Sequence, residues 1–160
     1  MQDDGASDLS AQQRRGFVWN AFRRAIAEAD LRFQVALDGV GVRIDERNGR
    51  IPDVLVQCGS LDDDAVWLTA PVILVEVVSP GSGMRDSRDK LLDYFSIPSL
   101  QHYLLVYTDK RLVVHHRRGA SDRDIATRIQ EDGKIDLSPP GFSLAVASFF
   151  EDDRGSLSAI

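Results

Sequence analysis

Changes in the spacing of hydrophobic residues divide the chain into predicted helices and strands. Over residues 9–30 and again over residues 86–95, apolar side chains recur at the spacing of an amphipathic helix. A short closing helix is predicted over residues 146–150. The other apolar segments are short and β-prone. They predict strands over residues 31–37, 40–44, 53–57, 71–78, 102–107, 111–117, 125–130 and 135–137.

Turn pairs connect several of these strands. Asp38-Gly39 predicts a hairpin between the first two strands, Asn48-Gly49 marks a further turn, and Asp132-Gly133 predicts a hairpin between the last two. Residues 71–78 are apolar on both faces, as in a central covered strand. The order of elements predicts an α/β (α+β) fold, a mixed sheet flanked by helices. We expect a single domain over residues 1–160, with a flexible start at 1–9 and a tail at 151–160.

The composition is that of a folded globular protein. Hydrophobic residues make up 43% of the chain and charged residues 28%, which excludes a disordered or collagen-like chain. No apolar run approaches the length of a membrane span, and the polar start does not resemble a secretion signal. Cys58 is the single cysteine and fits a reducing compartment. We therefore expect a cytoplasmic protein without a membrane partner.

The charge balance counts against a nucleic-acid partner unless basic residues gather locally. There are 19 Lys and Arg residues against 25 Asp and Glu residues, a formal net charge of -6. Basic residues occur in adjacent pairs, either on a solvated face or in a local patch for a polyanion. The pairs are Arg14-Arg15, Arg23-Arg24, Lys110-Arg111 and Arg117-Arg118.

Glu76 is the first candidate for chemistry, because it is an ionisable residue inside an otherwise apolar strand. A buried carboxylate needs a cation, hydrogen-bond donors or a metal to compensate its charge. Alternatively, the strand lies at a sheet edge and Glu76 is solvated. Asp53, at the start of another predicted strand, is a second candidate. Two carboxylates on neighbouring strands would raise each other's pKa unless a divalent cation lay between them.

The helix predicted after the Glu76 strand carries further candidates. Asp86, Lys90 and Tyr94 follow one another at intervals of four residues, so they share one helix face that could look toward the two carboxylates. The alternative for Asp86 and Lys90 is an ordinary exposed ion pair. His115 and His116 are adjacent in a predicted strand and point to opposite faces, so they are expected to be structural.

An ordered set of motifs in this chain resembles that of the Uma-type putative restriction endonucleases, a branch of the PD-(D/E)xK nuclease superfamily. The motifs are Pro52-Asp53, then Glu76 to Pro80, then Asp86, Lys90 and Tyr94, and finally Ile97 to Val106. The resemblance covers residues 4–117 and is strongest over residues 51–106. It implies a restriction-endonuclease-like mixed β-sheet flanked by helices.

The resemblance also implies a role for each matching residue. Asp53 and Glu76 would hold Mg²⁺ or Mn²⁺, assisted by the Val77 carbonyl. The superfamily lysine normally stands two residues after the acid, but Val78 occupies that position here. Lys90 is therefore nominated to orient the attacking water or to stabilise charge on the phosphoryl group. The supporting residues would be Ser79, Asp86 and Tyr94.

Three functions stay open at this point. The first is a Mg²⁺-dependent endonuclease that hydrolyses phosphodiester bonds in DNA and forms a homodimer, as members of the resembled family often do. The second is a catalytically inactive nuclease-fold protein that acts as a binding or interaction module. It is favoured by the net charge, by a short start without the family's Tyr-Glu-Leu segment, and by Ser10 where a histidine is often found. The third is metal-dependent hydrolysis of a different phosphoester.

Overall fold

The computed structural model describes residues 4–37, 39–59, 67–80, 84–121 and 123–150, with the backbone alone for residues 4–11 and 84–87. The helices are α1 (Asp4–Glu28), α2 (Met84–Phe95) and the short 3₁₀ helix η1 (Val146–Phe149). The strands are β1 (Phe33–Leu37), β2 (Gly41–Arg43), β3 (Gly49–Arg50), β4 (Val54–Cys58), β5 (Trp67–Leu68), β6 (Pro71–Val78), β7 (His102–Tyr107), β8 (Leu112–Arg118), β9 (Ile125–Gln130), β10 (Lys134–Leu137) and β11 (Phe142–Ala145).

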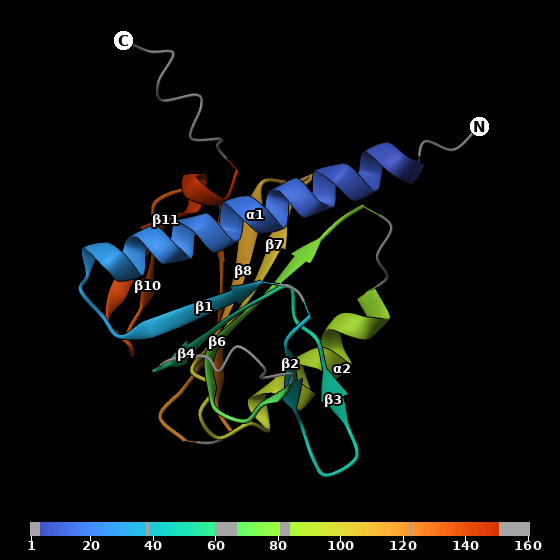
Figure 1. Cartoon of the computed structure of the whole chain (residues 1–160). Helices are drawn as coiled ribbons and strands as arrows, with labels where there is room; N and C mark the ends of the chain where they lie inside the picture. The colour runs from blue at the N-terminus through green and yellow to red at the C-terminus, as the bar shows by residue number, and fades with distance from the viewer. Residues whose placement is uncertain (1–3, 38, 60–66, 81–83, 122, 151–160) are drawn as a thin grey trace.

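A mixed six-stranded sheet with the order β1-β4-β6-β7-β8-β9 forms the centre of the fold (Figure 1). Its strands pair antiparallel except for β6 and β7, which run parallel. Two small sheets accompany it, with the orders β3-β2-β5 and β10-β11. The predicted mixed sheet flanked by helices is therefore confirmed, and β6 is a central strand as its apolar character indicated.

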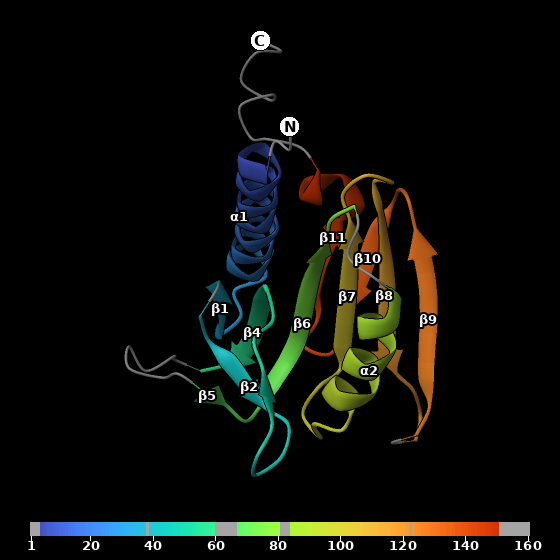
Figure 2. The same cartoon turned by 90° about the vertical axis from the view of Figure 1, so that its right-hand side faces the viewer.

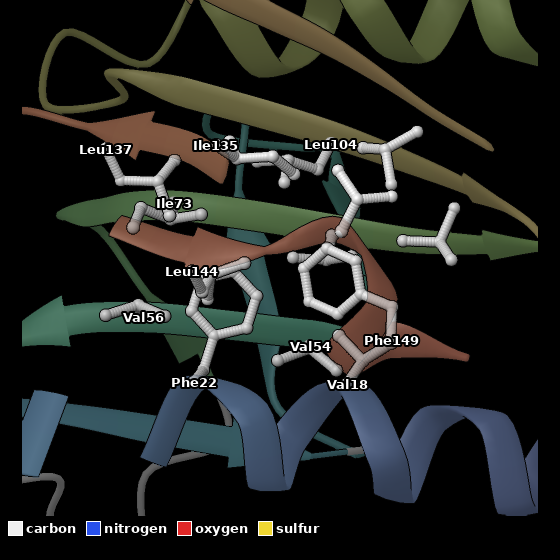
Figure 3. Packing of buried hydrophobic residues seen from close by; sticks show 14 of the residues in the cluster. Val18, Phe22, Val54, Val56, Ile73, Leu104, Ile135, Leu137, Leu144 and Phe149 are labelled. Carbon is white, nitrogen blue, oxygen red and sulfur yellow. The ribbon is translucent and has the colours of Figure 1, made fainter. Parts of the chain in front are cut away.

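One face of the central sheet packs against α1, η1 and the β10-β11 hairpin. Val18 and Phe22 of α1 are fully buried and point toward β4 and β6 (Figure 3). Phe149 of η1 stacks on Phe22 with ring centroids 5.8 Å apart. Val18 and Phe22 lie four residues apart, so they share the apolar face of α1. Burial of this face holds α1 against the sheet.

The opposite face packs against α2 and the β3-β2-β5 sheet. Tyr94 and Phe95 of α2 are buried against Leu74 of β6 and Leu105 of β7. Alternate residues of each central strand therefore serve two cores, one on each side of the sheet. Glu76 shares its face with Leu74, so it points toward α2.

The parallel pairing of β6 and β7 brings several segments to one end of the molecule. Because both strands run in the same direction, the carboxyl end of β6 lies beside the turn that joins β7 to β8. Figure 2 shows that the first half of α1 and η1 lie at this same end, which we call the upper edge of the sheet.

Neither of the two described α-helices combines the length and apolar character needed to cross a membrane.

Several local predictions were wrong. β1 pairs with β4, and β2 pairs with β3 and β5, so Asp38-Gly39 does not close a hairpin between β1 and β2. Likewise β9 pairs with β8, whereas β10 pairs with β11. In both cases the burial of apolar faces in separate sheets outweighs the local turn signal. The turn at Asn48-Gly49 is confirmed, since the amide of Ile44 donates to the carbonyl of Asn48 at 2.9 Å.

The first helix also begins earlier than the hydrophobic pattern indicates. α1 starts at Asp4, so its backbone includes most of the stretch expected to form a flexible start. The predicted tail at residues 151–160 lies outside the described residues.

Candidate functional site

Glu76 is buried near the carboxyl end of β6. The residue is 7% exposed, in a strand that pairs on both sides, so the alternative of a solvated edge position is wrong. Its Oε1 accepts a hydrogen bond from the Tyr94 hydroxyl at 2.7 Å, and the Lys90 ammonium lies 3.8 Å from the same oxygen. The compensating donor and cation that a buried carboxylate requires both come from α2.

Burial raises the pKa of the Glu76 carboxyl to about 7. The hydrogen bond from Tyr94 and the charge of Lys90 work in the other direction, because both stabilise the carboxylate. The charge of Asp53, and a hydrogen bond between the two carboxyl groups, add to the increase. A cation bound beside Glu76 would lower the pKa of Glu76, because it would stabilise the ionised carboxylate.

Asp53 stands immediately before β4 and is tied to β6. Its Oδ2 accepts the backbone N–H of Val77 at 2.7 Å, and its Oδ1 lies 3.2 Å from Nε of Arg15. The side chain is 18% exposed, so the ion pair is partly shielded from water. Because β4 and β6 are neighbours in the sheet, Asp53 and Glu76 are held close together, as their positions in the sequence predicted.

α2 presents Lys90 and Tyr94 to these carboxylates on one helix face. Tyr94 is fully buried, with its ring 5.0 Å from that of Tyr103. Burial and the nearby Glu76 raise the pKa of the Tyr94 hydroxyl, which therefore remains a hydrogen-bond donor. Lys90 is one helical turn earlier and contacts Glu76, so it is not merely half of an exposed surface pair.

The structure says less about the other residues predicted for the site. Ser79 follows the end of β6 and is partly buried, three residues beyond Glu76. Asp86 belongs to α2, but its side chain lies outside the described residues. Val77 contributes its N–H to Asp53, whereas the role predicted for its carbonyl as a metal ligand remains a prediction.

Arg15 is a residue of this site that the motifs did not identify. It comes from α1, on the other face of the sheet, and reaches the upper edge to pair with Asp53. In the sequence, Arg14-Arg15 is one of four adjacent basic pairs, and nothing in its spacing distinguishes it from the other three. A second ion pair lies beside Tyr94. Nε of Arg50 is 2.7 Å from Oδ2 of Asp93, the residue that precedes Tyr94 in α2.

The donor set fits a small divalent cation. Asp53 and Glu76 supply carboxylate oxygens, the ligands that Mg²⁺ prefers, and their mutual repulsion would be relieved by a cation between them. The described part of the chain contains no cluster of three or more His, Cys, Asp and Glu side chains, so the remaining ligands would be water, substrate or backbone oxygens. Arg15 already supplies one positive charge to Asp53.

Comparisons with known proteins identify the family and support the fold. The sequence model of the Uma2 family, described as "Putative restriction endonuclease", matches residues 5–147. An uncharacterized protein from Synechocystis sp. is 30% identical over 123 residues, which is 76% of this chain, and the chain spans 60% of that relative's length. The crystal structure of a putative nuclease belonging to DUF820 from Anabaena variabilis has a TM-score of 0.67 and 13% sequence identity. That match covers 88% of this chain and 79% of the other.

These matches differ in what they establish. The similarity to the Anabaena protein shows the fold alone, because the identity is low. The family match covers most of the chain and includes Asp53, Glu76 and Lys90. The protein therefore belongs to the Uma2 family, whose members are described as putative restriction endonucleases.

Proposed function

We propose that the protein is an endonuclease that uses Mg²⁺ or Mn²⁺ to hydrolyse phosphodiester bonds in DNA. The observation that carries the proposal is the convergence of Asp53 and Glu76 from neighbouring strands, with the Lys90 ammonium 3.8 Å from Glu76. Membership in a family described as putative restriction endonucleases supports DNA as the substrate. A pair of acids with an adjacent cation is a common arrangement for phosphoryl chemistry.

The two carboxylates would hold the metal, which when bound polarises a phosphoryl oxygen and activates a water molecule. The N–H of Val77 fixes the orientation of Asp53, and the hydroxyl of Tyr94 fixes that of Glu76. Glu76 must be ionised to act as a ligand, and Lys90 and Tyr94 both favour its ionised form.

Lys90 has a separate part in the proposed mechanism. Its side chain is 26% exposed, so the ammonium lies between the buried Glu76 and solvent. From this position it stabilises negative charge that develops on the phosphoryl group, or orients the attacking water. The lysine thus replaces the one that the superfamily places two residues after the acid, where this chain has Val78.

A second candidate is a nuclease-fold protein that binds a partner without cleaving it. The observation that favours this candidate is the Arg15–Asp53 ion pair, which supplies a charge that a metal would otherwise supply. Arg15, Lys90 and Tyr94 together compensate both carboxylates without a bound ion.

Two further parts of the proposal concern the whole protein. A homodimer is expected from the family resemblance, and sedimentation analysis would test it. A cytoplasmic location is expected because a chain with the single cysteine Cys58 fits a reducing compartment.

Plasmid cleavage tests the proposed activity. We expect the wild type to cleave supercoiled DNA with Mg²⁺ or Mn²⁺ and not with EDTA. Asp53→Asn and Glu76→Gln should abolish cleavage, because each replaces a charged carboxylate ligand with a neutral amide. Lys90→Ala should lower the rate by on the order of 100-fold, the usual cost of one electrostatic group at a reacting centre.

Arg88→Ala is the matched control for Lys90→Ala, because Arg88 is an exposed cation two residues earlier on α2. It should cleave at the wild-type rate. Equal cleavage by the wild type and Asp53→Asn would contradict the proposed site. A wild type that binds DNA but never cleaves it would leave the second candidate in place of the nuclease.

A further inference from the structure

Two arginines from distant parts of the chain converge on the ring of Phe150. The guanidinium carbon of Arg14, in α1, lies 5.6 Å from the ring centroid, and that of Arg111, in the turn between β7 and β8, lies 5.2 Å from it. Arg14 also donates a hydrogen bond to the carbonyl of Phe149 at 3.3 Å. Among the described residues, neither arginine forms an ion pair with a carboxylate.

Bringing these two like charges together costs free energy. Partial burial and the charge of Arg111 lower the pKa of Arg14, although an arginine remains ionised at neutral pH. The face of the Phe150 ring and the Phe149 carbonyl offset part of the repulsion. An anion between the guanidinium groups would offset the rest, and the planar fork of arginine N–H donors matches a phosphate.

The arginine pair belongs to the same end of the central sheet as the carboxylates of the proposed nuclease site. Arg14 is adjacent in sequence to Arg15, which contacts Asp53. Arg111 follows β7, which runs parallel to the Glu76 strand β6, so its turn lies at the upper edge of the sheet. The first half of α1, which carries Arg14, also lies at this end (Figure 2). Lys110 precedes Arg111 in the same turn. This edge therefore collects positive charge in a chain whose net charge is -6.

The other two basic pairs contain arginines with structural contacts elsewhere. Arg23 lies over the ring of Trp19 at 4.7 Å on α1. Arg118 donates to backbone carbonyls that follow α2, at 2.7 Å to Leu100 and 2.9 Å to Ile97. Of the four pairs, Arg14-Arg15 and Lys110-Arg111 are the two that meet at the upper edge.

We infer that Arg14 and Arg111 form a binding site for a backbone phosphate of DNA, beside the phosphodiester bond presented to Asp53 and Glu76. The choice of DNA as the ligand rests on the proposed function. The geometry contributes the site itself: two guanidinium groups on one ring, without a carboxylate partner among the described residues, at the edge where the proposed reaction occurs. Binding at this site needs no metal.

Fluorescence anisotropy of a labelled DNA duplex of about 20 base pairs, measured in EDTA over a range of salt concentrations, tests the inference. The first variant is Arg111→Asn. Arg111 is exposed and has a φ of 52°, a left-handed conformation that asparagine tolerates, so the turn should be kept. We expect about 5- to 10-fold weaker binding, and a salt slope smaller in magnitude by about 0.9 for the lost phosphate contact.

Companion variants separate this site from a general charge effect. Arg14→Gln should weaken binding to a similar extent, and Arg111→Lys, which keeps the charge, should recover most of the affinity. Arg23→Gln removes the same charge from the same helix away from the upper edge and should bind as the wild type does. Circular dichroism checks that each variant is folded.

The inference is overturned if the wild type binds the duplex and both Arg111→Asn and Arg14→Gln bind it with unchanged affinity and salt slope. It is also overturned if the folded wild type does not bind DNA. A separate titration of Mn²⁺ into the same samples distinguishes the two claims. Metal binding that depends on Asp53 and Glu76, together with unchanged DNA binding by the arginine variants, would remove the phosphate site and leave the metal site intact.

Discussion

Single side chains decide whether the acid pair at the upper edge can hold a metal. Arg15 is the residue whose effect has the clearest sign, because its guanidinium and a divalent cation would compete for Asp53. The value of a partly exposed ion pair is about 0.2–1 kcal/mol. We therefore predict that Arg15→Gln binds Mn²⁺ up to about 5-fold more tightly than the wild type, as measured by isothermal titration calorimetry.

Arg23→Gln serves as the control for this variant, since it removes an equal charge from α1 away from Asp53. An Arg15→Gln protein that is folded yet binds Mn²⁺ more weakly than the wild type would show that Arg15 supports the metal site. The competition between arginine and metal would then be wrong.

At the scale of elements, a buried histidine pair joins β7, β8 and the β10-β11 hairpin. Nε2 of His102 lies 2.7 Å from the carbonyl of Pro139, and its Nδ1 lies 2.9 Å from Nε2 of His115. A carbonyl can only accept, so Nε2 of neutral His102 donates to Pro139 and Nδ1 accepts from His115. The pair lies on the face of the sheet that packs against α1. Its hydrogen bond to Pro139 therefore holds the β10-β11 hairpin against this face.

The histidine pair predicts a loss of stability in acid. Burial lowers the pKa of both His102 and His115 to about 4 from an ordinary value of 6.5, with Arg117 adding to the effect and Asp136 opposing it. Between these values the unfolded chain binds more protons, so the free energy of unfolding falls as the pH is lowered from 6.5 to 4. We expect His115→Gln to lose less stability over this range than the wild type, by on the order of 2–3 kcal/mol.

Urea denaturation of metal-free protein at pH 7 and at pH 4.5 measures this difference. Glu76 acts with the opposite sign, because its raised pKa makes the folded state bind the extra proton, but it is present in both proteins and cancels in the comparison. Equal pH dependence in His115→Gln and the wild type would contradict the role assigned to the pair.

The small β3-β2-β5 sheet depends on close packing of a tryptophan against glycine. An added Cβ at Gly41 would lie 2.5 Å from the ring of Trp67, too close for any side chain. We predict that Gly41→Ala destabilises the protein by about 1–3 kcal/mol in urea denaturation. The same change in a Trp67→Ala background should cost less, because the clash is absent. An equal cost in both backgrounds would rule out the ring as the cause.

The elements also show where sequence reasoning succeeds and where it stops. The two apolar faces of β6 predict its central position, and the four-residue spacing of Lys90 and Tyr94 predicts their shared helix face. The Asp38-Gly39 and Asp132-Gly133 hairpins were wrong because strand pairing is decided by distant partners, β4 for β1 and β8 for β9. Local turn chemistry carries no information about those partners.

At the scale of the whole molecule, charge is distributed in a way that the sequence total conceals. A net charge of -6 argued against a DNA partner, yet two of four basic pairs meet at the edge that holds Asp53 and Glu76. Glu76 could be identified as a candidate because an ionisable residue interrupts an apolar strand, and Asp53 because it stands at the start of another predicted strand. Arg15 and the Arg14–Arg111 pair could not, because their positions depend on how α1 crosses the sheet.

The central claim is that Asp53 and Glu76 form one divalent-cation site. Isothermal titration of Mn²⁺ into the metal-free protein tests it most directly, with Glu46→Gln, an exposed acid in the turn between β2 and β3, as the control. We predict saturable binding to the wild type and to Glu46→Gln, and its loss in Asp53→Asn and Glu76→Gln that remain folded. No saturable binding at millimolar Mn²⁺, or binding that persists in both site variants, would contradict the claim.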